Sequence, residues 1–543
     1  MGKNFKKNKD YKFKKEHKKF ESFKEYTHAE ETSLDSIDIS KKGNDFIVSG
    51  LIDQIEQTGG PTILHLTDGT ATLALKAFEG AGIRAYPEIN VGDAIKATIT
   101  IQEYNQELEG EVVKLQKLDS ENKKQILENI TKIQRKRSEV VPKPFLVEDQ
   151  ILEKLKDRFF KAATEVRLAI IQNRPIIIRH HNDTDGYSSG YALERAILPL
   201  IVKQHNSVKA AWEFYTRSPI SAPMYEIEDS IRDTAHSLSR AAKFSNKMPL
   251  VLVVDTGSGE KDLLGVQQGK VHGIDFIVVD HHAFDKDVIS KETIVHINPF
   301  LVKEDGAKFS AGMLCTELAR FINPDENLNI LQIPAMAGLA DKTDNPKAIE
   351  SYLKLAEKKG YTKSLLSDIA LVIDFVSAKL RFMEAREYIE VLFGEPMERQ
   401  KALVKLLAPY IRDLERKGLE IAKDSAEIEK VKDISLQTIE IEKTYARGFY
   451  PKPGKCVSIL HEDGYESRKI NKIITLGLMA DAITIRASAE SYFSVNELVT
   501  YLQKTIPKAF VEGGGHKYAG SIRFLPNKQT AVIKEIKEYI KSL

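Results

Sequence analysis

Short apolar runs in the middle of the chain constrain its fold more than any other feature. They are rich in aliphatic and aromatic residues, alternate with longer segments of helical period, and span residues 175–180, 212–215, 249–254, 275–279 and 294–297. Apolar runs of this length are typical of strands buried on both faces of a parallel sheet. Their alternation with helices predicts an α/β fold with a doubly wound parallel sheet.

Three of the predicted strands end in acids or histidines. The run 180–186 (His-His-Asn-Asp-Thr-Asp-Gly) closes the first strand, Asp255 follows the strand at 249–254, and 280–282 (Asp-His-His) follows the strand at 275–279. Parallel strands present their carboxyl ends at one edge of the sheet, where ligands bind. Clustered carboxylates repel one another unless a cation neutralises them. Carboxylates with imidazoles suit Mn²⁺ or Zn²⁺, so the strand ends predict a metal site.

A β-rich segment precedes this region, with strands expected at 46–52, 62–66, 71–78, 93–101 and 110–115. So many short strands in succession predict a small closed barrel. The turns at 60–61 (Gly-Pro) and 68–69 (Asp-Gly) make the segment similar to OB-fold modules of nucleic-acid-binding proteins. Such modules stack bases on aromatic side chains or serve as protein docks, and both roles stay open. The candidate aromatic residues are Phe46, Phe78, Tyr86 and Tyr104.

Composition and charge narrow the class of protein. The 543 residues suggest about three or four domains. Residues 1–25 hold ten lysines and four acids and should be disordered, either as a nucleic-acid arm or as a solubilising tail. No apolar run reaches ~18 residues and no secretory signal is present, so we expect a cytoplasmic protein. Cys315 and Cys456 are too far apart for a zinc motif and should pack as small apolar residues.

The remainder of the chain is helical over 346–428 and mixed thereafter. Strands are expected at 436–441, 456–460, 473–478 and 483–487, followed by a helix near 494–505, a glycine cluster and a terminal helix. This pattern predicts a second, smaller α/β lobe. The predicted organisation is a disordered basic tail (1–40), an OB-like nucleic-acid-binding barrel (41–118), a linker (119–148), a catalytic α/β domain (149–345), a helical connector (346–428) and a substrate-binding α/β lobe (429–543).

Several motifs resemble one family when they are taken together. The run 180–186, Asp-Thr-Gly at 255–257, Asp-His-His at 280–282 and Asp341 resemble the DHH phosphoesterases. Gly513, Gly514, Gly515 and His516 resemble the GGGH motif of the DHH-associated C-terminal domain, and Arg486 resembles the phosphate-gripping arginine of that domain. We expect the three glycines to let the backbone approach phosphate closely and their N–H groups to form an anion-binding nest. With the barrel in front, the chain resembles the archaeal RecJ-like single-strand exonucleases.

The resemblance implies a set of site residues. Two Mn²⁺ ions, with Mg²⁺ as the alternative, would be bridged by Asp255; the other metal ligands would be His181, Asp183, Asp185, His281 and Asp341. His282 would contact the scissile phosphate, and Asp280 would orient a neighbouring histidine. Substrate would be bound by Arg486, Gly513, Gly514, Gly515 and His516. His180 is a rival to His181, and Asp344 is a weaker rival to Asp341.

The implied activity is hydrolysis of single-stranded DNA, or RNA, by metal-activated water, with release of nucleoside monophosphates during DNA replication or repair. The implied partners are a single strand and a helicase or another replisome component. The alternatives are a phosphodiesterase for short oligonucleotides or cyclic dinucleotides, and a replisome scaffold. The segment 310–312 (Ser-Ala-Gly) opens a predicted helix and could bind phosphate at the helix N-terminus or act as a plain N-cap.

Overall fold

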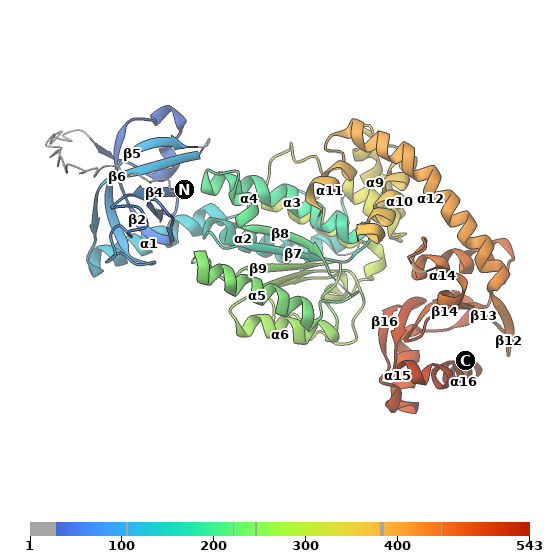
Figure 1. The fold of residues 1–543 in the computed structure, drawn as a ribbon. Coiled ribbons are helices and arrows are strands. Elements are labelled where there is room, and N and C mark those ends of the chain that lie inside the picture. Colours follow the sequence, from blue (N-terminus) through green and yellow to red (C-terminus); the bar gives the residue numbers. More distant parts are fainter. Residues whose placement is uncertain (1–28, 105–106, 221, 245–246, 381–384, 447) are drawn as a thin grey trace, which may run out of the picture.

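The computed structural model describes residues 29–543, with the exception of 105–106, 221, 245–246, 381–384 and 447. Three bodies lie in a row, namely a β-barrel, a central α/β domain and a C-terminal α/β lobe (Figure 1). The long helix α12 (Met397–Ser425) connects the central body to the C-terminal lobe. The basic tail predicted from the sequence lies mostly in residues 1–28, outside the described residues.

The N-terminal body is the closed barrel that the sequence predicts. Its strands are β2 (Asp45–Gln57), β3 (Thr62–Thr67), β4 (Thr72–Ala77), β5 (Ala94–Tyr104) and β6 (Glu107–Lys117). They pair in the order β2-β3-β4-β6-β5, and β5 closes the barrel by pairing with β2. The β4–β6 pair is parallel and the others are antiparallel. Phe46 is a core residue, only 8% exposed, and therefore cannot stack on a base as we expected.

Residues before β2 also belong to the barrel. Strand β1 (Glu30–Glu31) pairs with β2, and two 3-10 turns follow at Leu34–Ser36 and Ile39–Lys41. Leu34 and Ile37 are buried in the barrel core. Because these apolar side chains cover the barrel, the barrel domain begins before residue 41, where we had predicted its start. Helix α1 (Ser120–Ser138) then occupies much of the predicted linker.

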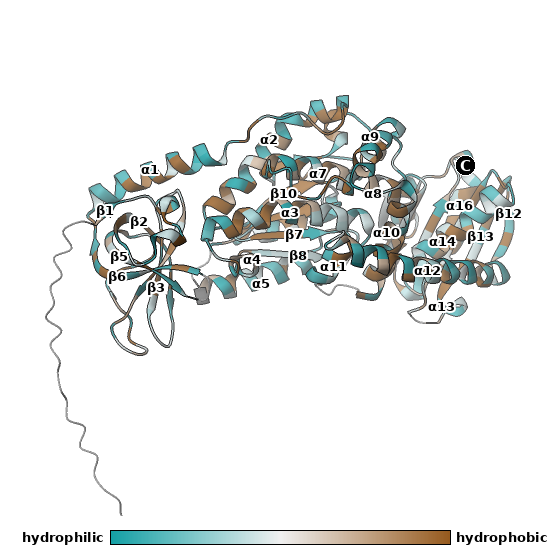
Figure 2. Cartoon of the chain, turned by 90° about the horizontal axis from the view of Figure 1, so that it is seen from above, coloured by the Kyte–Doolittle hydropathy of each residue, from teal (hydrophilic) through white to brown (hydrophobic). Residues whose placement is uncertain are grey.

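The central domain is the predicted doubly wound parallel sheet. Its order is β11-β10-β9-β7-β8, and all pairs are parallel. The strands are β7 (Ile176–His180), β8 (Tyr215–Pro219), β9 (Leu250–Val254), β10 (Asp275–Val279) and β11 (Val295–Ile297). One face packs on α2 (Gln150–Ile171), α3 (Thr184–His205) and α7 (Ala311–Ile322), and the other on α5 (Ile227–Phe244) and α6 (Leu263–Val271) (Figures 1 and 2).

Successive side chains of each strand point to opposite faces of the central sheet. Ile176 and Ile178 of β7 join the core with α2 and α3, whereas Ile177 joins a second core with Tyr225 and Val266. The strands are apolar at consecutive positions because both faces of the sheet are covered. Figure 2 shows these apolar strands between amphipathic helices.

Two predicted strands are helices instead. Residues 210–213 form the short helix α4 (Ala210–Glu213), and β8 begins only at Tyr215. Residues 453–462 form α14 (Pro453–Glu462), in which Pro453 starts the helix and Cys456 and Leu460 are buried one turn apart. Both strand predictions were wrong because an apolar run of four or five residues fits either a strand or one buried helical turn.

The C-terminal lobe is a mixed six-stranded sheet in the order β12-β13-β14-β15-β17-β16. The strands are β12 (Glu427–Val431), β13 (Ile434–Glu440), β14 (Ile473–Leu478), β15 (Ala482–Ala487), β16 (Glu512–His516) and β17 (Ala519–Arg523). Helices α15 (Val495–Thr505) and α16 (Gln529–Ser542) share one core with the sheet, and α14 packs on β14 and β15.

The connector between the two α/β bodies is helical, as predicted. It contains α9 (Pro346–Glu357), α10 (Lys363–Leu380), α11 (Arg386–Leu392) and α12, and it follows α8 (Ile333–Ala340) of the central domain. Within the described ranges, every helix is too short or too polar to cross a bilayer.

Candidate metal centre

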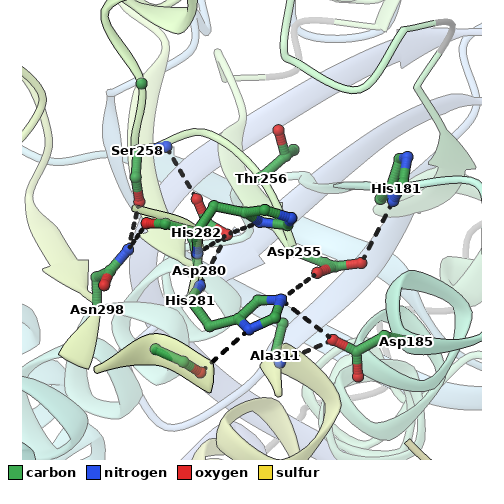
Figure 3. A network of polar contacts seen from close by, with 12 residues as sticks. His181, Asp185, Asp255, Thr256, Ser258, Asp280, His281, His282, Asn298 and Ala311 are labelled. Carbon is green, nitrogen blue, oxygen red and sulfur yellow. Dashed lines mark hydrogen bonds and ion pairs between the residues drawn. The ribbon is translucent and has the colours of Figure 1, made fainter. Parts of the chain in front are cut away.

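Asp255 lies at the centre of the side chains gathered at the carboxyl edge of the sheet (Figure 3). It follows β9 directly, adopts a left-handed backbone conformation with φ of 59°, and is only 2% exposed. Its N–H donates to the Val279 carbonyl at 2.9 Å, which ties it to the neighbouring strand β10. Non-glycine residues persist in this strained region when the surrounding structure holds them, and such positions cluster at functional sites.

Histidines approach both carboxylate oxygens of Asp255. Oδ1 lies 3.4 Å from His281 Nε2, and Oδ2 lies 3.7 Å from His181 Nδ1. Oδ2 is buried and has no hydrogen-bond partner. Burial raises the pKa of the Asp255 carboxyl well above its usual range, and nearby carboxylates raise it further, those of Asp185, Asp183, Asp341 and Asp280. A buried carboxylate in such surroundings stays ionised only if a cation neutralises the cluster.

The potential ligands fall into two adjoining sets that a third one connects. His181, Asp183 and Asp255 form one set, Asp185, His281 and Asp341 form the other, and the connecting set is Asp255, His281 and His282; within each set the ligand atoms lie within 4.8 Å of one another. His281 Nε2 contacts Asp255 as well, so the two sets meet at that carboxylate. The donor types and the orphaned Asp255 oxygen fit two divalent transition metal ions.

Backbone amides hold Asp185 in place. Its Oδ2 accepts from the Ala311 N–H at 2.8 Å and its Oδ1 from the Gly312 N–H at 2.9 Å, both in the first turn of α7. These amides are therefore occupied by a candidate metal ligand, and the prediction that 310–312 binds phosphate is wrong. Ser310 makes no side-chain cap either. The N-terminus of α7 carries a partial positive charge that attracts the Asp185 carboxylate.

Asp280 orients the second histidine of the triplet. Its Oδ1 accepts from His282 Nδ1 at 2.8 Å and from the His281 N–H at 2.8 Å, and its Oδ2 accepts from the Ser258 N–H at 3.1 Å. Burial alone would lower the pKa of His282, but the charge and hydrogen bond of Asp280 outweigh it and raise that pKa to about 9. His282 is therefore a fixed imidazolium near pH 7.

Asn298 and His296, which we did not predict, also contact the residues around Asp280. Asn298 Nδ2 donates to the His282 carbonyl at 3.0 Å and to Ser258 Oγ at 2.9 Å (Figure 3). His296 lies 2.8 Å from the same Ser258 hydroxyl. Asn298 directly follows β11, and the rule that polar residues at strand ends belong to the site would have found it.

The structure shows which residue of each rival pair, His180 or His181 and Asp341 or Asp344, is the candidate metal ligand. The His180 side chain is fully buried, its Nδ1 lies 2.7 Å from the His181 carbonyl, and its ring packs edge-on against Tyr187. Burial lowers the pKa of His180 to about 3. His181, and not His180, therefore joins the cluster. Asp344 lies outside both ligand sets, and its N–H donates to the Ala307 carbonyl at 2.7 Å.

Comparison with known proteins agrees with this geometry. Residues 175–340 match the model of the DHH family N-terminal domain. The solved DHH domain of a protein from a family of ribosomal proteins is 34% identical, with a TM-score of 0.75, over 78% of this chain and 100% of that one. The chain belongs to the DHH family. This finding confirms the resemblance of the sequence motifs to those of the DHH phosphoesterases.

This chain is also similar to two further proteins. An uncharacterized protein of Methanocaldococcus jannaschii, MJ1198, is 36% identical over 525 residues, which cover 91% of this DHH protein and 68% of the relative. The crystal structure of exonuclease RecJ bound to manganese is 17% identical, with a TM-score of 0.49, over 74% of this chain and 97% of that one.

The C-terminal lobe of this DHH protein contacts the rim of the metal centre. Lys452, at the start of α14, donates to the Asn182 carbonyl at 3.1 Å, and Glu462, at the end of α14, pairs with Lys342. Lys261 donates to the Gly513 carbonyl of β16 at 2.7 Å. Helix α14 thus spans from the loop before Asp183 to the residue after Asp341.

The glycine motif has a different structure from the one we expected. Gly513, Gly514 and Gly515 lie in β16, an edge strand paired with β17, and in this strand they do not form the anion nest that we expected. A Cβ atom on Gly513 would lie 2.4 Å from the Ser521 carbonyl oxygen, and one on Gly515 would lie 2.5 Å from that of Ala519. Close strand pairing is what requires these glycines. The side chain of His516 is outside the described part of the chain.

Arg486 lies on β15 beside α14. Its Nε donates to Ser458 Oγ at 2.9 Å and its Nη1 to the Ile485 carbonyl at 2.8 Å. Burial lowers the pKa of the Arg486 guanidinium, yet an arginine keeps its charge at neutral pH. These two bonds fix the guanidinium plane, which a bidentate phosphate contact needs.

Proposed function

We propose that this DHH protein is a cytoplasmic, Mn²⁺-dependent exonuclease, with Mg²⁺ as the alternative ion, that hydrolyses phosphodiester bonds of single-stranded DNA, and also of RNA, in DNA replication or repair. The observation that carries the proposal is the meeting of two ligand sets at one buried carboxylate, Asp255. Paired metal sites that share a carboxylate are the usual device for phosphodiester hydrolysis.

In the proposed centre, His181, Asp183 and Asp255 would hold one ion, and Asp185, His281 and Asp341 would hold the other, close to Asp255. When bound, the two ions lower the pKa of a shared water and stabilise the attacking and leaving oxygens. Asp185 keeps its orientation through the α7 amides, at 2.8 and 2.9 Å. Such supporting contacts set the affinity of a metal site.

His282 acts on the substrate rather than on a metal in this proposal. Its imidazolium, held by Asp280 at 2.8 Å, contacts a non-bridging oxygen of the scissile phosphate. A fixed positive charge at that oxygen stabilises the negative charge that develops in the transition state. Asp280 positions this ring and makes no contact with the phosphate.

The cations at the lobe contacts favour a chain of phosphates as the substrate. Lys452, Lys342 and Lys261 all lie where the C-terminal lobe meets the central domain. The guanidinium of Arg486, held by Ser458, would bind one more phosphate. Neighbouring phosphates of a strand would engage several of these cations at once, and this neutralisation gives affinity without sequence preference. The products would be nucleoside monophosphates, and a helicase or another replisome component is the protein partner we expect.

The test uses single-stranded DNA and RNA labelled at either end, incubated with Mn²⁺, Mg²⁺ or a chelator. Wild-type protein, Asp255→Asn and the control Asp344→Asn are compared, because Asp344 lies outside both ligand sets. We expect metal-dependent release of mononucleotides by the wild type and the control, and none by Asp255→Asn.

Other outcomes identify the alternatives. Turnover of dinucleotides or cyclic dinucleotides without cleavage of long strands would support a small-substrate phosphodiesterase. Loss of all turnover, together with retained binding to replisome proteins, would support a scaffold.

A further inference from the structure

The outer face of the barrel that binds strands in OB-type modules is covered in this protein. In such barrels, oligonucleotides lie on the second and third strands and on the loop between the fourth and fifth. The second and third strands of this barrel are β3 and β4, and Thr72 of β4 lies 2.9 Å from Asn173 Nδ2 of the central domain. Asn173 also donates to Asp53 at 2.9 Å, and Asp53 pairs with Lys247 at 2.6 Å.

The start of β6 also contacts the central domain. Glu107, at the start of β6, accepts from the Ser207 hydroxyl at 2.6 Å and pairs with Lys209 at 3.1 Å. Residues that follow α2 and α3 thus lie on the side of the barrel that would hold bases. The barrel uses this face to dock on the catalytic domain.

A hollow of about 480 Å³ lies elsewhere on the barrel, between the end of β4, the loop that follows it, and β6. Phe78 and Ile83 line it and are 68% and 56% exposed. Tyr86 and Val112 add apolar surface, and Tyr86 is held in the left-handed region with φ of 52°. Exposed large apolar side chains that converge on one hollow mark a binding surface.

The rim of the hollow is acidic. Glu79 and Glu88 line it, and across the described ranges neither carboxylate has an ion-pair partner. Arg84 also lines the hollow and donates its Nη2 to the Ile89 carbonyl at 2.7 Å, so two carboxylates and one guanidinium give the lining a net negative charge. Burial raises the pKa of Tyr86, and the charges of Glu88 and Glu79 raise it further, which places both carboxylates near the phenol. This charge repels phosphates and attracts lysine and arginine.

We propose that the hollow docks a segment of a partner protein in which aromatic or branched aliphatic side chains stand between lysines or arginines. The apolar side chains would fill the floor formed by Phe78, Ile83, Tyr86 and Val112. The flanking cations would pair with Glu79 and Glu88. Such a surface combines an apolar anchor with charges that select the partner.

The test measures fluorescence anisotropy with the full chain and labelled synthetic probes. One peptide carries two phenylalanines separated and flanked by lysines; matched peptides carry alanine for phenylalanine or glutamate for lysine, and oligothymidylate represents a strand. The variants are Phe78→Ser and the double variant Glu79→Lys with Glu88→Lys. The control is Glu128→Lys with Glu326→Lys, an equal charge change at exposed positions outside the hollow.

We expect the lysine–phenylalanine peptide to bind, and both matched peptides and both hollow variants to weaken binding by about tenfold or more. The control should bind like the wild type, and salt should weaken the wild-type interaction. Oligothymidylate binding that Phe78→Ser abolishes would overturn the proposal in favour of a strand site. Self-association of the full chain that Phe78→Ser abolishes would assign the hollow to a second copy, and peptide binding equal in all variants would also overturn it.

Discussion

His282 Nδ1 lies 2.8 Å from Asp280 Oδ1, and this contact keeps the imidazole charged at pH values well above the ordinary pKa of a histidine. Because the pKa of His282 is about 9, a step that needs the imidazolium should persist up to about pH 9 and be lost above it. In Asp280→Asn the imidazolium should instead deprotonate nearer its ordinary pKa of about 6.5. The pH dependence of kcat on a labelled strand tests this, with Asp344→Asn as the control. An unchanged alkaline limb in Asp280→Asn would refute the role of Asp280.

Gly312 leaves no room for a side chain beside Asp185. A Cβ atom there would lie 2.8 Å from Asp185 Oδ1 and 2.6 Å from the Ala337 Cβ. Gly312→Ala should therefore displace the carboxylate and weaken Mn²⁺ binding by roughly tenfold to a hundredfold. Isothermal titration with Mn²⁺ measures this directly. Gly59→Ala, where a Cβ would meet nothing within 4 Å, is the matched control and should bind like the wild type. Equal affinities in the two variants would contradict the ligand role of Asp185.

Lys452 ties the C-terminal lobe to the loop before Asp183. It donates to the Asn182 carbonyl at 3.1 Å and to Ser377 Oγ at 3.3 Å. If it also contacts substrate phosphate, Lys452→Met should raise KM for a long strand by about tenfold and flatten its salt dependence. Lys455→Met, which removes a lysine paired with Glu415 on α12, serves as the control. A fall in kcat with unchanged KM would show that Lys452 acts on the catalytic loop alone.

Glu194 and Arg217 form a buried ion pair on the central sheet. They are 1% and 4% exposed, and Arg217 Nε donates to Glu194 Oε2 at 2.8 Å. Arg217→Met should lower the free energy of unfolding by about 3–5 kcal/mol, because it removes the hydrogen-bonded partner of a buried carboxylate and leaves the longer contact to Arg386 Nε, 3.8 Å away. Urea unfolding measures the change. Arg416→Met breaks an exposed pair and should cost about 1 kcal/mol or less, so similar costs for both variants would argue against the buried pair.

The sequence predicted the central sheet well because its strands are apolar on both faces and alternate with segments of helical period. It failed at two short apolar runs that lie within helices. Trp212 in α4 and Cys456 in α14 both lie in such runs. Local period alone cannot separate the two structures, and the packing of neighbouring elements decides between them.

In the metal centre, too, some features follow from the sequence and others from packing. Residue types and their order determined that Asp183, Asp255 and His281 would meet, because each follows a parallel strand of one sheet and such ends share an edge. Which of His180 and His181 faces that edge was decided by packing, since the ring of His180 is buried against Tyr187.

Contacts between distant segments decided the rest. The α7 amides serve Asp185 rather than a phosphate, although the two partners are more than a hundred residues apart. The glycines at 513–515 lie in a strand because β17 pairs closely with them. A sequence specifies which groups are available and where strands end. Only the tertiary structure determines which of those groups become partners, because hydrogen bonding and burial depend on neighbours that the local sequence does not contain.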